Sequence, residues 1–346
     1  MSVGLRVRSV GPGVTLQDMG RTGWMAKGVS RGGAADTVAL YEGAALLGQE
    51  PECAAIEMAG MGASFQVEGG ALIIALTGAP MTATLDGEAL AWNATHALVP
   101  GQTLTIGAAK SGVYGYLHLA GGVAGTEVMG SRSVHRAAGI GHAVSAGDFV
   151  AAQTGDGRAV PGLGLEVEDR FSGGPLRLVP SAQTARFDAS TRARFCATAF
   201  SRDARGNRMG VRLNHDGAPF QAADQLGVVS EMVVPGDVQI GGDGAPYALM
   251  SECQTTGGYP RIGTILPQDM ARLAQAAPGA PLRFEFVAHD EALASHRSWS
   301  AVLARLPANV APRIRDPRDM TDLLSYQLIS GAVTGREDPG QGEGAP

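Results

Sequence analysis

Polar side chains gather at three places in this sequence where its pattern otherwise predicts strands and turns. The first is the segment 14–23, in which Gln17, Asp18 and Arg21 stand among glycines at the expected end of a strand. A carboxylate beside a guanidinium can orient a planar amide, or stabilise negative charge that develops on an oxygen. The same residues could equally form a salt-bridged turn, so the segment alone leaves both interpretations open.

The second place is the segment 253–261, which combines an amide, two hydroxyls and a phenol with a Gly-Gly pair. Glycines expose backbone N–H groups, and such a loop can cradle an anion or a carbonyl oxygen. A wide hairpin loop anchored by the tyrosine is the alternative, but the amount of hydrogen-bonding capacity favours a site. Its candidate binding residues are Gln254, Thr255, Thr256, Gly257, Gly258 and Tyr259.

The third place is a predicted strand that carries two arginines. Arg208 and Arg212 lie an even number of residues apart, so in a strand both point to the same face. That face would suit a carboxylate or a phosphate, and also an ordinary solvated surface. Glu57 and Glu231 each follow an apolar or small-residue segment and are candidates for an acid or a base.

Several conventional sites are excluded by their motifs. The sequence has no Gly-x-x-x-x-Gly-Lys-Ser/Thr phosphate loop and no Gly-x-Ser-x-Gly nucleophile elbow. Its three cysteines are scattered and the spacing of its histidines fits no metal site, so we predict neither a metal nor a disulfide framework. His118 lies in an apolar strand and is predicted to be a core residue, whereas His135 and His142 flank a glycine-rich loop.

Composition narrows the class of protein. The chain has 346 residues, 45% of them hydrophobic and 17% charged, which suits two packed domains plus a tail. A net charge of −6 gives no basic face for nucleic acid. The N-terminus lacks the apolar stretch of a signal peptide, and no apolar run approaches membrane-spanning length. We therefore expect a cytoplasmic protein without a membrane or nucleic-acid partner.

The elements that must position these residues are mainly strands. The 50 glycines separate short apolar stretches, as in an all-β protein with tight turns. A turn placed just before a strand recurs twice in each half, which suggests two related barrel-like units. The predicted strands are Ala71–Thr77, Gly112–Leu119, Leu176–Pro180, Tyr247–Met250 and Leu282–Val287, and the predicted helices are Thr37–Leu47 capped by Asp36, Gln268–Ala276, Glu291–Leu306 capped by Asp290, and Met320–Ile329.

Taken in order, these segments resemble the allophanate hydrolase subunit 2 family, also called the biotin-dependent carboxyltransferase family, and within it the 5-oxoprolinase members. The resemblance covers about residues 5–290 and its most specific motif is 254–260. The sequence differs from the usual family pattern in the segment Gly43–Gln49, where the family usually has Ala-Asn-x-Leu-Val-Gly-Asn, and at Asn207 and Glu252, where it often has aspartate. The motifs that carry it are Gln17–Gly23, Gly33–Asp36, Ala55–Glu57, Arg208–Leu213, Ser230-Glu231 and Gln254–Pro260.

The resemblance implies a mainly β fold of two cyclophilin-like β-barrel domains with a few short helices. The domains would span residues 1–160 and 175–290, joined by a linker at 153–174, with a helical extension at 291–334 and a disordered tail at 335–346. It further implies a partner of the allophanate hydrolase subunit 1 type and a third subunit of the lactam-utilisation type. Together they would use ATP, bound through the complex, to open the lactam of 5-oxoproline to glutamate.

The resemblance also assigns roles to the three polar segments, on the expectation that residues 17–21, 208–212 and 254–259 surround one cleft. Arginines would bind carboxylate or phosphate, the 254–259 loop would hold the lactam, and carboxylates would act as acid, base or orienting groups. The expected catalytic residues are Asp18, Arg21, Asp36, Glu57, Glu231 and Tyr259, and the expected substrate-binding residues are Gln17, Arg208, Arg212, Gln254, Thr255, Thr256, Gly257 and Gly258.

Two other functions stay open at this point. The first is carboxyl transfer from biotin to urea or a related amide. Lys27 lacks the Met-Lys-Met pattern of a biotin-accepting lysine, so the biotin would have to arrive on another protein. The second is a non-enzymatic antagonist of the partner subunit, which resemblance to a kinase antagonist of sporulating bacteria allows.

Overall fold

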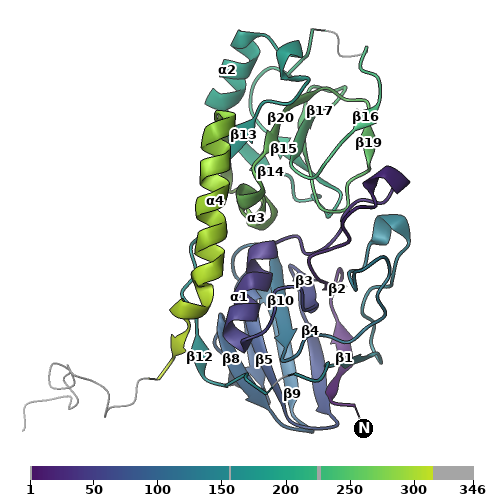
Figure 1. Cartoon of the computed structure of the whole chain (residues 1–346), viewed down its shortest axis with the longest axis vertical. Coiled ribbons are helices and arrows are strands. Elements are labelled where there is room, and N and C mark those ends of the chain that lie inside the picture. Colours follow the sequence, from purple (N-terminus) through teal and green to yellow (C-terminus); the bar gives the residue numbers. More distant parts are fainter. Residues whose placement is uncertain (1, 156, 224–226, 315–346) are drawn as a thin grey trace, which may run out of the picture.

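The computed structural model describes residues 2–155, 157–223 and 227–314, and these form two lobes (Figure 1). The N-terminal lobe holds two sheets and the C-terminal lobe holds a closed barrel. The prediction of a mainly β chain with few helices is therefore confirmed, and so is the barrel in the second half. In the first half the strands pair as two sheets that share one core.

The two sheets of the N-terminal lobe are antiparallel and pack face to face. Phe65 and Leu104 from one sheet, and Ile74 and Leu117 from the other, lie in the same buried cluster. The first sheet runs in the order β11 (Phe149–Ala151), β1 (Gly4–Val10), β4 (Ala63–Glu68), β9 (Thr103–Ala109), β6 (Met81–Leu85) and β7 (Glu88–Ala89). The second runs β2 (Thr15–Gln17), β3 (Ala55–Ala59), β10 (Tyr114–Leu119), β5 (Leu72–Gly78), β8 (Ala94–Leu98), β12 (Leu163–Gly164) and β22 (Ala311–Pro312).

Burial explains the residue choice in these strands. In β4, buried and partly exposed residues alternate, as expected when one face of a strand meets the core. Every residue of β10 is buried, because helix α1 (Thr37–Leu47) covers the other face of the second sheet at this strand. β10 is accordingly a nearly continuous run of apolar and aromatic residues.

The C-terminal lobe is a seven-stranded barrel filled by aromatic rings. Phe195 lies 4.9 Å from Phe200 and 5.0 Å from Phe284, measured between ring centroids, and Phe220 completes the cluster. A small sheet of β16 (Glu231–Met232) and β19 (Thr256–Gly257) stands beside the barrel. The barrel order is β13 (Gly174–Val179), β20 (Arg261–Ile265), β17 (Asp237–Ile240), β18 (Pro246–Leu249), β15 (Gly210–Asn214), β14 (Phe200–Arg202) and β21 (Pro281–Phe286), where β21 closes on β13 in parallel.

The first predicted helix is confirmed to the residue. The carboxylate of Asp36 accepts a hydrogen bond from the backbone N–H of Ala39 at 3.3 Å, and Gly48 ends the helix in the left-handed region with φ of 64°. These are the N-cap and C-cap roles that the sequence predicts. The five predicted strands also appear, with ends that differ by no more than two residues from the prediction.

The later helices differ from prediction in detail. The helix expected at 268–276 is a 3₁₀ turn, η4 (Pro267–Asp269), followed by α3 (Met270–Gln275). The predicted cap Asp290 is wrong, since α4 (His289–Arg305) begins after Ala288 and places Asp290 in its first turn. Helix α2 (Ala189–Ala197) was not predicted, because Phe195 is its one buried residue and it shows little apolar periodicity. The expected helix 320–329 and tail 335–346 lie outside the described residues. The other 3₁₀ turns are η1 (Met25–Lys27), η2 (Arg136–Ala138), η3 (Thr184–Arg186) and η5 (Leu306–Asn309).

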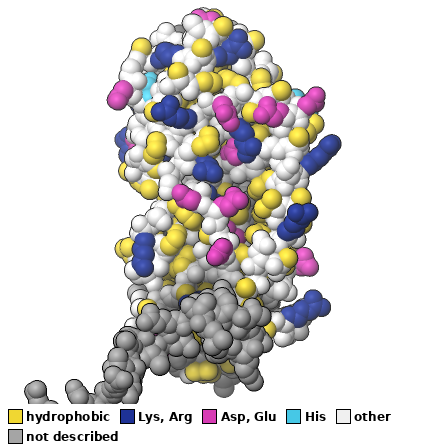
Figure 2. All heavy atoms as spheres, turned by 90° about the vertical axis from the view of Figure 1, so that its left-hand side faces the viewer, with side chains coloured by type: hydrophobic (Ala, Val, Ile, Leu, Met, Phe, Trp, Pro, Cys, Tyr) yellow, Lys and Arg dark blue, Asp and Glu magenta, His cyan; other side chains and the backbone are white. Residues whose placement is uncertain are grey.

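Helix α4 runs along both lobes and returns the chain to the N-terminal lobe (Figure 1). Near its start Ala292 packs with Leu266 of the barrel lobe, and after its end Leu306 packs against a cluster that contains Leu46 and Leu47 of α1. β22 then pairs with β12 at the edge of the second sheet. Figure 2 shows side chains of both charge signs scattered over this face of the molecule.

A buried ion cluster fixes one lobe against the other. Arg170, from the predicted linker, donates to Asp36 at 2.7 Å and to both carboxylate oxygens of Glu42 at 2.7 and 2.8 Å. Gln275 of α3 donates to Asp36 at 2.7 Å and to the carbonyl oxygen of Tyr114 at 2.8 Å. Asp36 is therefore a cap and an interlobe anchor, and nothing around it exposes its carboxylate to a ligand.

His118 is confirmed as a core residue. Its side chain lies in β10 beneath α1, and its Nε2 atom is 2.7 Å from the hydroxyl of Thr77. Burial lowers the pKa of His118 from 6.5 to about 3, so the folded protein keeps this imidazole neutral.

This burial predicts a specific loss of stability in acid. The unfolded chain binds a proton on His118 near pH 6.5, whereas the folded chain resists it until about pH 3. Within that window the unfolded state binds more protons, so this group lowers the free energy of unfolding by up to about 1.4 kcal/mol per pH unit as the pH falls. Urea titrations at several pH values should show a shallower decline for His118→Gln than for the wild type. His142→Gln, at an exposed position, is the control and should keep the wild-type slope.

Candidate functional site

A pocket of about 700 Å³, named the barrel-face pocket, lies over the outward-facing residues of the barrel strands β15, β17 and β18. It contains three of the predicted site residues, Arg212, Gln254 and Tyr259, brought together from β15 and from the loop 254–259. Met209 and Leu249 supply the apolar part of the pocket lining. The remaining lining residues are Asp203, Arg205, Gly206, Asn207, Gly210, Gln239, Gly241, Gly242, Asp243 and Tyr247.

The charge in this pocket comes from a pair, Arg212 and Asp243. The Nη1 atom of Arg212 donates to the carboxylate of Asp243 at 2.6 Å and to the hydroxyl of Tyr247 at 2.7 Å. The hydrogen bond from Arg212 is the largest cause that lowers the pKa of Asp243. The pair is about one-third to one-half exposed, so the remaining N–H groups of the guanidinium can meet a ligand.

One buried amide in the pocket has an unused donor. Gln239 is 3% exposed, and its Oε1 atom accepts a long hydrogen bond of 3.5 Å from Gln254. Its Nε2 atom has no hydrogen-bond partner among the described residues. An unpaired buried N–H group is costly, and a carbonyl or carboxylate oxygen in the pocket would relieve that cost. Tyr259, about half exposed at the rim, adds a phenol.

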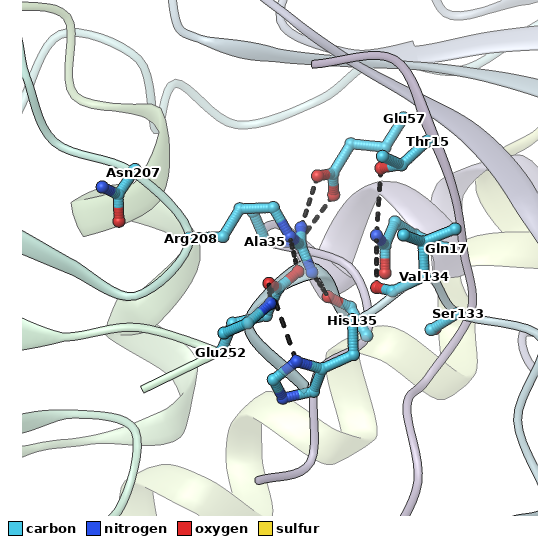
Figure 3. Close-up of polar contacts among 12 residues, drawn as sticks. Thr15, Gln17, Ala35, Glu57, Ser133, Val134, His135, Asn207, Arg208 and Glu252 are labelled. Atoms are coloured by element: carbon cyan, nitrogen blue, oxygen red, sulfur yellow. Dashed lines mark hydrogen bonds and ion pairs between the residues drawn. The ribbon is translucent and has the colours of Figure 1, made fainter. Parts of the chain in front are cut away.

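A second group of predicted residues forms a buried network between the lobes (Figure 3). Arg208 donates through Nη1 to Glu57, through Nη2 to the carbonyl oxygen of Gly33, and through Nε to Glu252 at 2.5 Å. Burial opposes the charge of Arg208, but Glu57 and Glu252 outweigh that effect and raise its pKa. The positive charge of Arg208 is matched by carboxylates within the protein, so Arg208 fastens one lobe to the other.

Glu57 is held on every side. One oxygen accepts from the backbone N–H of Ala35 at 2.8 Å and from the hydroxyl of Tyr116 at 2.7 Å, and the other accepts from Arg208. Burial, followed by the charge of Glu57, raises the pKa of Tyr116 well above its ordinary value. Glu57 is fully buried and does not line the barrel-face pocket, so this geometry gives it a structural role.

His135 extends the network on the side of the N-terminal lobe. Its Nδ1 atom accepts from the backbone N–H of Ala138 at 3.2 Å and lies 3.8 Å from Glu252, and its Nε2 atom is 2.8 Å from the hydroxyl of Ser30. Burial lowers the pKa of His135, although Glu252 acts in the opposite direction. The ring is therefore neutral and donates to Ser30.

The segment 17–21 supports a neighbouring loop. Asp18 accepts from the hydroxyls of Ser131 and Ser133 and from the backbone N–H of Arg132, and Gln17 donates to the carbonyl oxygen of Val134 at 3.1 Å. Arg21 is 1% exposed and donates to the carbonyl oxygen of Ser133. This segment holds the loop that carries His135. It does not line the barrel-face pocket, which contains Arg212, Gln254 and Tyr259.

The remaining predicted residues surround the pocket without lining it. Glu231 is about half exposed and pairs with Arg261 at 2.7 Å. Its strand β16 pairs with β19, which places Thr256 and Gly257 opposite Met232 and Glu231. Thr255 accepts from the backbone N–H of Val233 through its carbonyl oxygen at 3.1 Å. Gly258 follows β19 directly and leads into Tyr259, so the small sheet positions the loop.

Sequence reasoning missed several residues that shape the site. Asp243 and Tyr247 determine where Arg212 points, but they lie in a turn and a strand distant along the chain, with no motif. Gln239 carries no local signal either, because its polarity matters only once β17 is buried. Glu252 was noticed as a departure from a family pattern, and it proves to be one of the two carboxylates that bind Arg208.

Comparison with known proteins gives the class of protein. Residues 27–286 match the family described as carboxyltransferase domain, subdomain A and B. That is well over half of the chain, so the protein belongs to this carboxyltransferase-domain family.

Two relatives are more specific, and both are the C subunit of a bacterial 5-oxoprolinase. The chain is 32% identical over 308 residues to the one from Escherichia coli K12, covering 87% of this chain and 97% of the relative. It is also 32% identical over 288 residues to the one from Haemophilus influenzae, covering 80% of this chain and 89% of the relative. The resemblance to the 5-oxoprolinase members of the family is thereby confirmed.

Solved structures support the fold. TTHA0988 superposes with a TM-score of 0.74 at 27% identity over 82% of this chain, which spans 56% of the length of that protein. The urea amidolyase of K. lactis gives a TM-score of 0.80 at 19% identity over 91% of this chain and 21% of its own. The Kluyveromyces lactis urea carboxylase gives 0.79 at 19% identity over 91% of this chain and 31% of its own. At these low identities the two urea enzymes show the shared fold alone.

Two negative observations concern the described residues. Within residues 2–155, 157–223 and 227–314, no group of three or more His, Cys, Asp or Glu side chains is placed to hold a metal ion. No helix in the same ranges is long and apolar enough to cross a membrane.

The Arg208 network predicts a large difference between two arginines. Arg208→Met should lower the free energy of unfolding by about 3–5 kcal/mol, because it leaves Glu57 and Glu252 buried without a counter-charge. Arg212→Met breaks a half-exposed pair and should cost no more than about 1 kcal/mol. Urea unfolding followed by circular dichroism measures both. Equal stability of the two variants would contradict the fastening role of Arg208.

Proposed function

We propose that this protein is a subunit of an ATP-dependent 5-oxoprolinase, in which it binds the lactam while the complex opens it to glutamate. The observation that carries the proposal is the 32% identity to the Escherichia coli 5-oxoprolinase component over 97% of that protein. Identity spread over nearly the whole relative favours a shared role for the whole chain. The expected partners are an allophanate hydrolase subunit 1-like protein and a lactam-utilisation-type third subunit.

The chemistry of the barrel-face pocket suits this substrate. 5-Oxoproline carries a planar amide and a carboxylate on a small apolar ring. Arg212 and Tyr247 offer donors to the carboxylate, and the unused N–H group of Gln239 offers one to the lactam carbonyl. Met209 and Leu249 provide apolar contact for the ring. Tyr259 at the rim can close over the bound molecule.

The pocket does not suit a triphosphate. Arg205 and Arg212 pair with Asp203 and Asp243, so these four charges sum to zero, which is unfavourable for the several negative charges of a triphosphate and less so for the single carboxylate of 5-oxoproline. The proposal therefore assigns ATP to another part of the complex and gives this chain the tasks of binding and orienting the lactam.

Exposed apolar side chains near the pocket favour a site shared with a partner. Met209 and Tyr259 at the pocket, and Val229 and Met232 beside the loop 254–259, are all between 45% and 78% exposed. Large exposed apolar groups that gather beside a polar pocket are typical of a protein interface. A subunit 1-like partner that covers them would exclude water from the bound lactam.

Carboxyl transfer from carrier-borne biotin to urea or a related amide is the second candidate function. The match of residues 27–286 to the carboxyltransferase-domain family favours it. The same pocket would then hold the acceptor amide. A non-enzymatic antagonist of the partner is distinguished from both by an absence of turnover.

Reconstitution tests the proposal. The chain is mixed with its subunit 1-like partner and the third subunit, and glutamate release from 5-oxoproline is followed with and without ATP. A parallel reaction with urea, bicarbonate, ATP and a biotinylated carrier tests carboxyl transfer. Glutamate release that needs this chain and ATP supports the proposal. Turnover in the second reaction alone would replace it with carboxyl transfer, and no turnover in either would favour the antagonist.

Arg212→Gln should lower kcat/KM for glutamate release by about 10- to 100-fold, because a charged hydrogen bond to the substrate carboxylate is lost. Gln239→Met, which removes the buried N–H donor at nearly constant volume, should act in the same direction. Arg283→Gln changes the same charge at an exposed position on the barrel strand β21, away from the pocket, and should leave the rate unchanged. An undiminished rate in both pocket variants would remove this pocket from the mechanism.

A further inference from the structure

A second cavity, of about 380 Å³, lies between the two lobes. The loop that carries Gly206 and Asn207 lines both this cavity and the barrel-face pocket. Its other walls come from β2 and β10 of the N-terminal lobe, from η2, and from β14 and Arg208 of the barrel lobe. Arg208, which was predicted to bind substrate, lines this cavity, but its guanidinium is already paired with Glu57 and Glu252.

The cavity contains an arginine without a counter-charge. Arg202 is 4% exposed, and its Nε atom has no hydrogen-bond partner among the described residues. Its Nη1 and Nη2 atoms reach the carbonyl oxygens of Ala276 and Gly206 only at 3.4 Å each. No carboxylate of the described residues forms an ion pair with it. A buried guanidinium in this condition is costly to desolvate, and an anion would relieve that cost.

The neighbouring phenol cannot supply the missing charge. Burial raises the pKa of Tyr114, and although the charge of Arg202 and a hydrogen bond with Arg202 act against this, the shift stays upward. The hydroxyl of Tyr114 therefore remains neutral and available as a hydrogen-bond donor. Tyr114 lines the same cavity as Arg202.

The charged side chains that line the cavity are all arginines. Three arginines line it, Arg136, Arg202 and Arg208, and no aspartate or glutamate of the described residues does. Arg208 is neutralised by Glu57 and Glu252, but Arg136 is exposed on η2 and forms no ion pair with any described residue. A narrow cavity with unbalanced charge of one sign concentrates the opposite charge within it.

We propose that this interlobe cavity binds a small molecule through an oxyanion group, a phosphate or a carboxylate. Arg202 attracts the oxyanion from the interior, Tyr114 donates a hydrogen bond, and Arg136 binds it from the rim. Because the walls belong to both lobes, the bound anion also ties the lobes together. The inference rests on the chain alone and does not depend on the oxoprolinase proposal.

Calorimetric titration of the full chain tests this at constant ionic strength, so that general screening does not change. Inorganic phosphate and glutarate are the two probes, and whichever binds identifies the source of the oxyanion. We expect saturable binding that is about tenfold weaker in Arg202→Gln, since hydrogen bonds to charged groups are among the strongest in proteins. Arg136→Gln should weaken it several-fold. Arg297→Gln, at an exposed position on α4, is matched in charge and should bind as the wild type does.

The variants also locate the binding. If Arg202→Gln does not fold, the exposed Arg136→Gln decides the matter alone. Binding that is lost in Arg212→Gln but kept in Arg136→Gln would belong to the barrel-face pocket and would overturn the proposal. Absence of saturable binding with both probes would overturn it as well. Loss of glutamate release in the reconstituted complex leaves this result untouched, so the two proposals fail separately.

Discussion

The structure depends on buried ion pairs that cross from one lobe to the other. Arg208 of the barrel lobe binds Glu57 of the N-terminal lobe, and Arg170 of the connecting segment binds both Asp36 and Glu42 of the N-terminal lobe. Each guanidinium is almost fully enclosed, so its attraction to the carboxylates is little weakened by water. The desolvation cost is recovered only when both lobes are in register, and these pairs therefore specify one arrangement of the lobes.

That arrangement creates the interlobe cavity, whose walls come from both lobes. The backbone around Arg208 forms the loop that separates the barrel-face pocket from the interlobe cavity. The ion pairs of Arg208 fix the position of this loop. Helix α4 reinforces the same register from the outside, since its two ends pack on different lobes. Unused hydrogen-bonding capacity remains on residues outside the network, such as Arg212, Gln239 and Arg202.

The motifs identify the family of this protein, but they do not assign a role to each of their residues. Motifs such as Arg208–Leu213 and Gln254–Pro260 identify a lineage, and the match of residues 27–286 confirms it. Several polar residues of those motifs, Asp18, Asp36 and Glu57 among them, hold backbone groups and neighbouring charges. A motif records which residues belong together in a fold, and that set includes structural residues as well as those that could touch a substrate.

Local chemistry was enough to determine the mainly β class, the five strands and helix α1 with both of its caps, because turns, alternation and capping act within a few residues. The sequence also placed His118 in the core. Only the tertiary structure decided which polar groups remain free: Gln239, Asp243 and Arg202 gain their surroundings from strands distant in sequence. Whether a guanidinium is neutralised or left for a ligand depends on carboxylates that approach from elsewhere in the chain, and no spacing along the sequence encodes that distance.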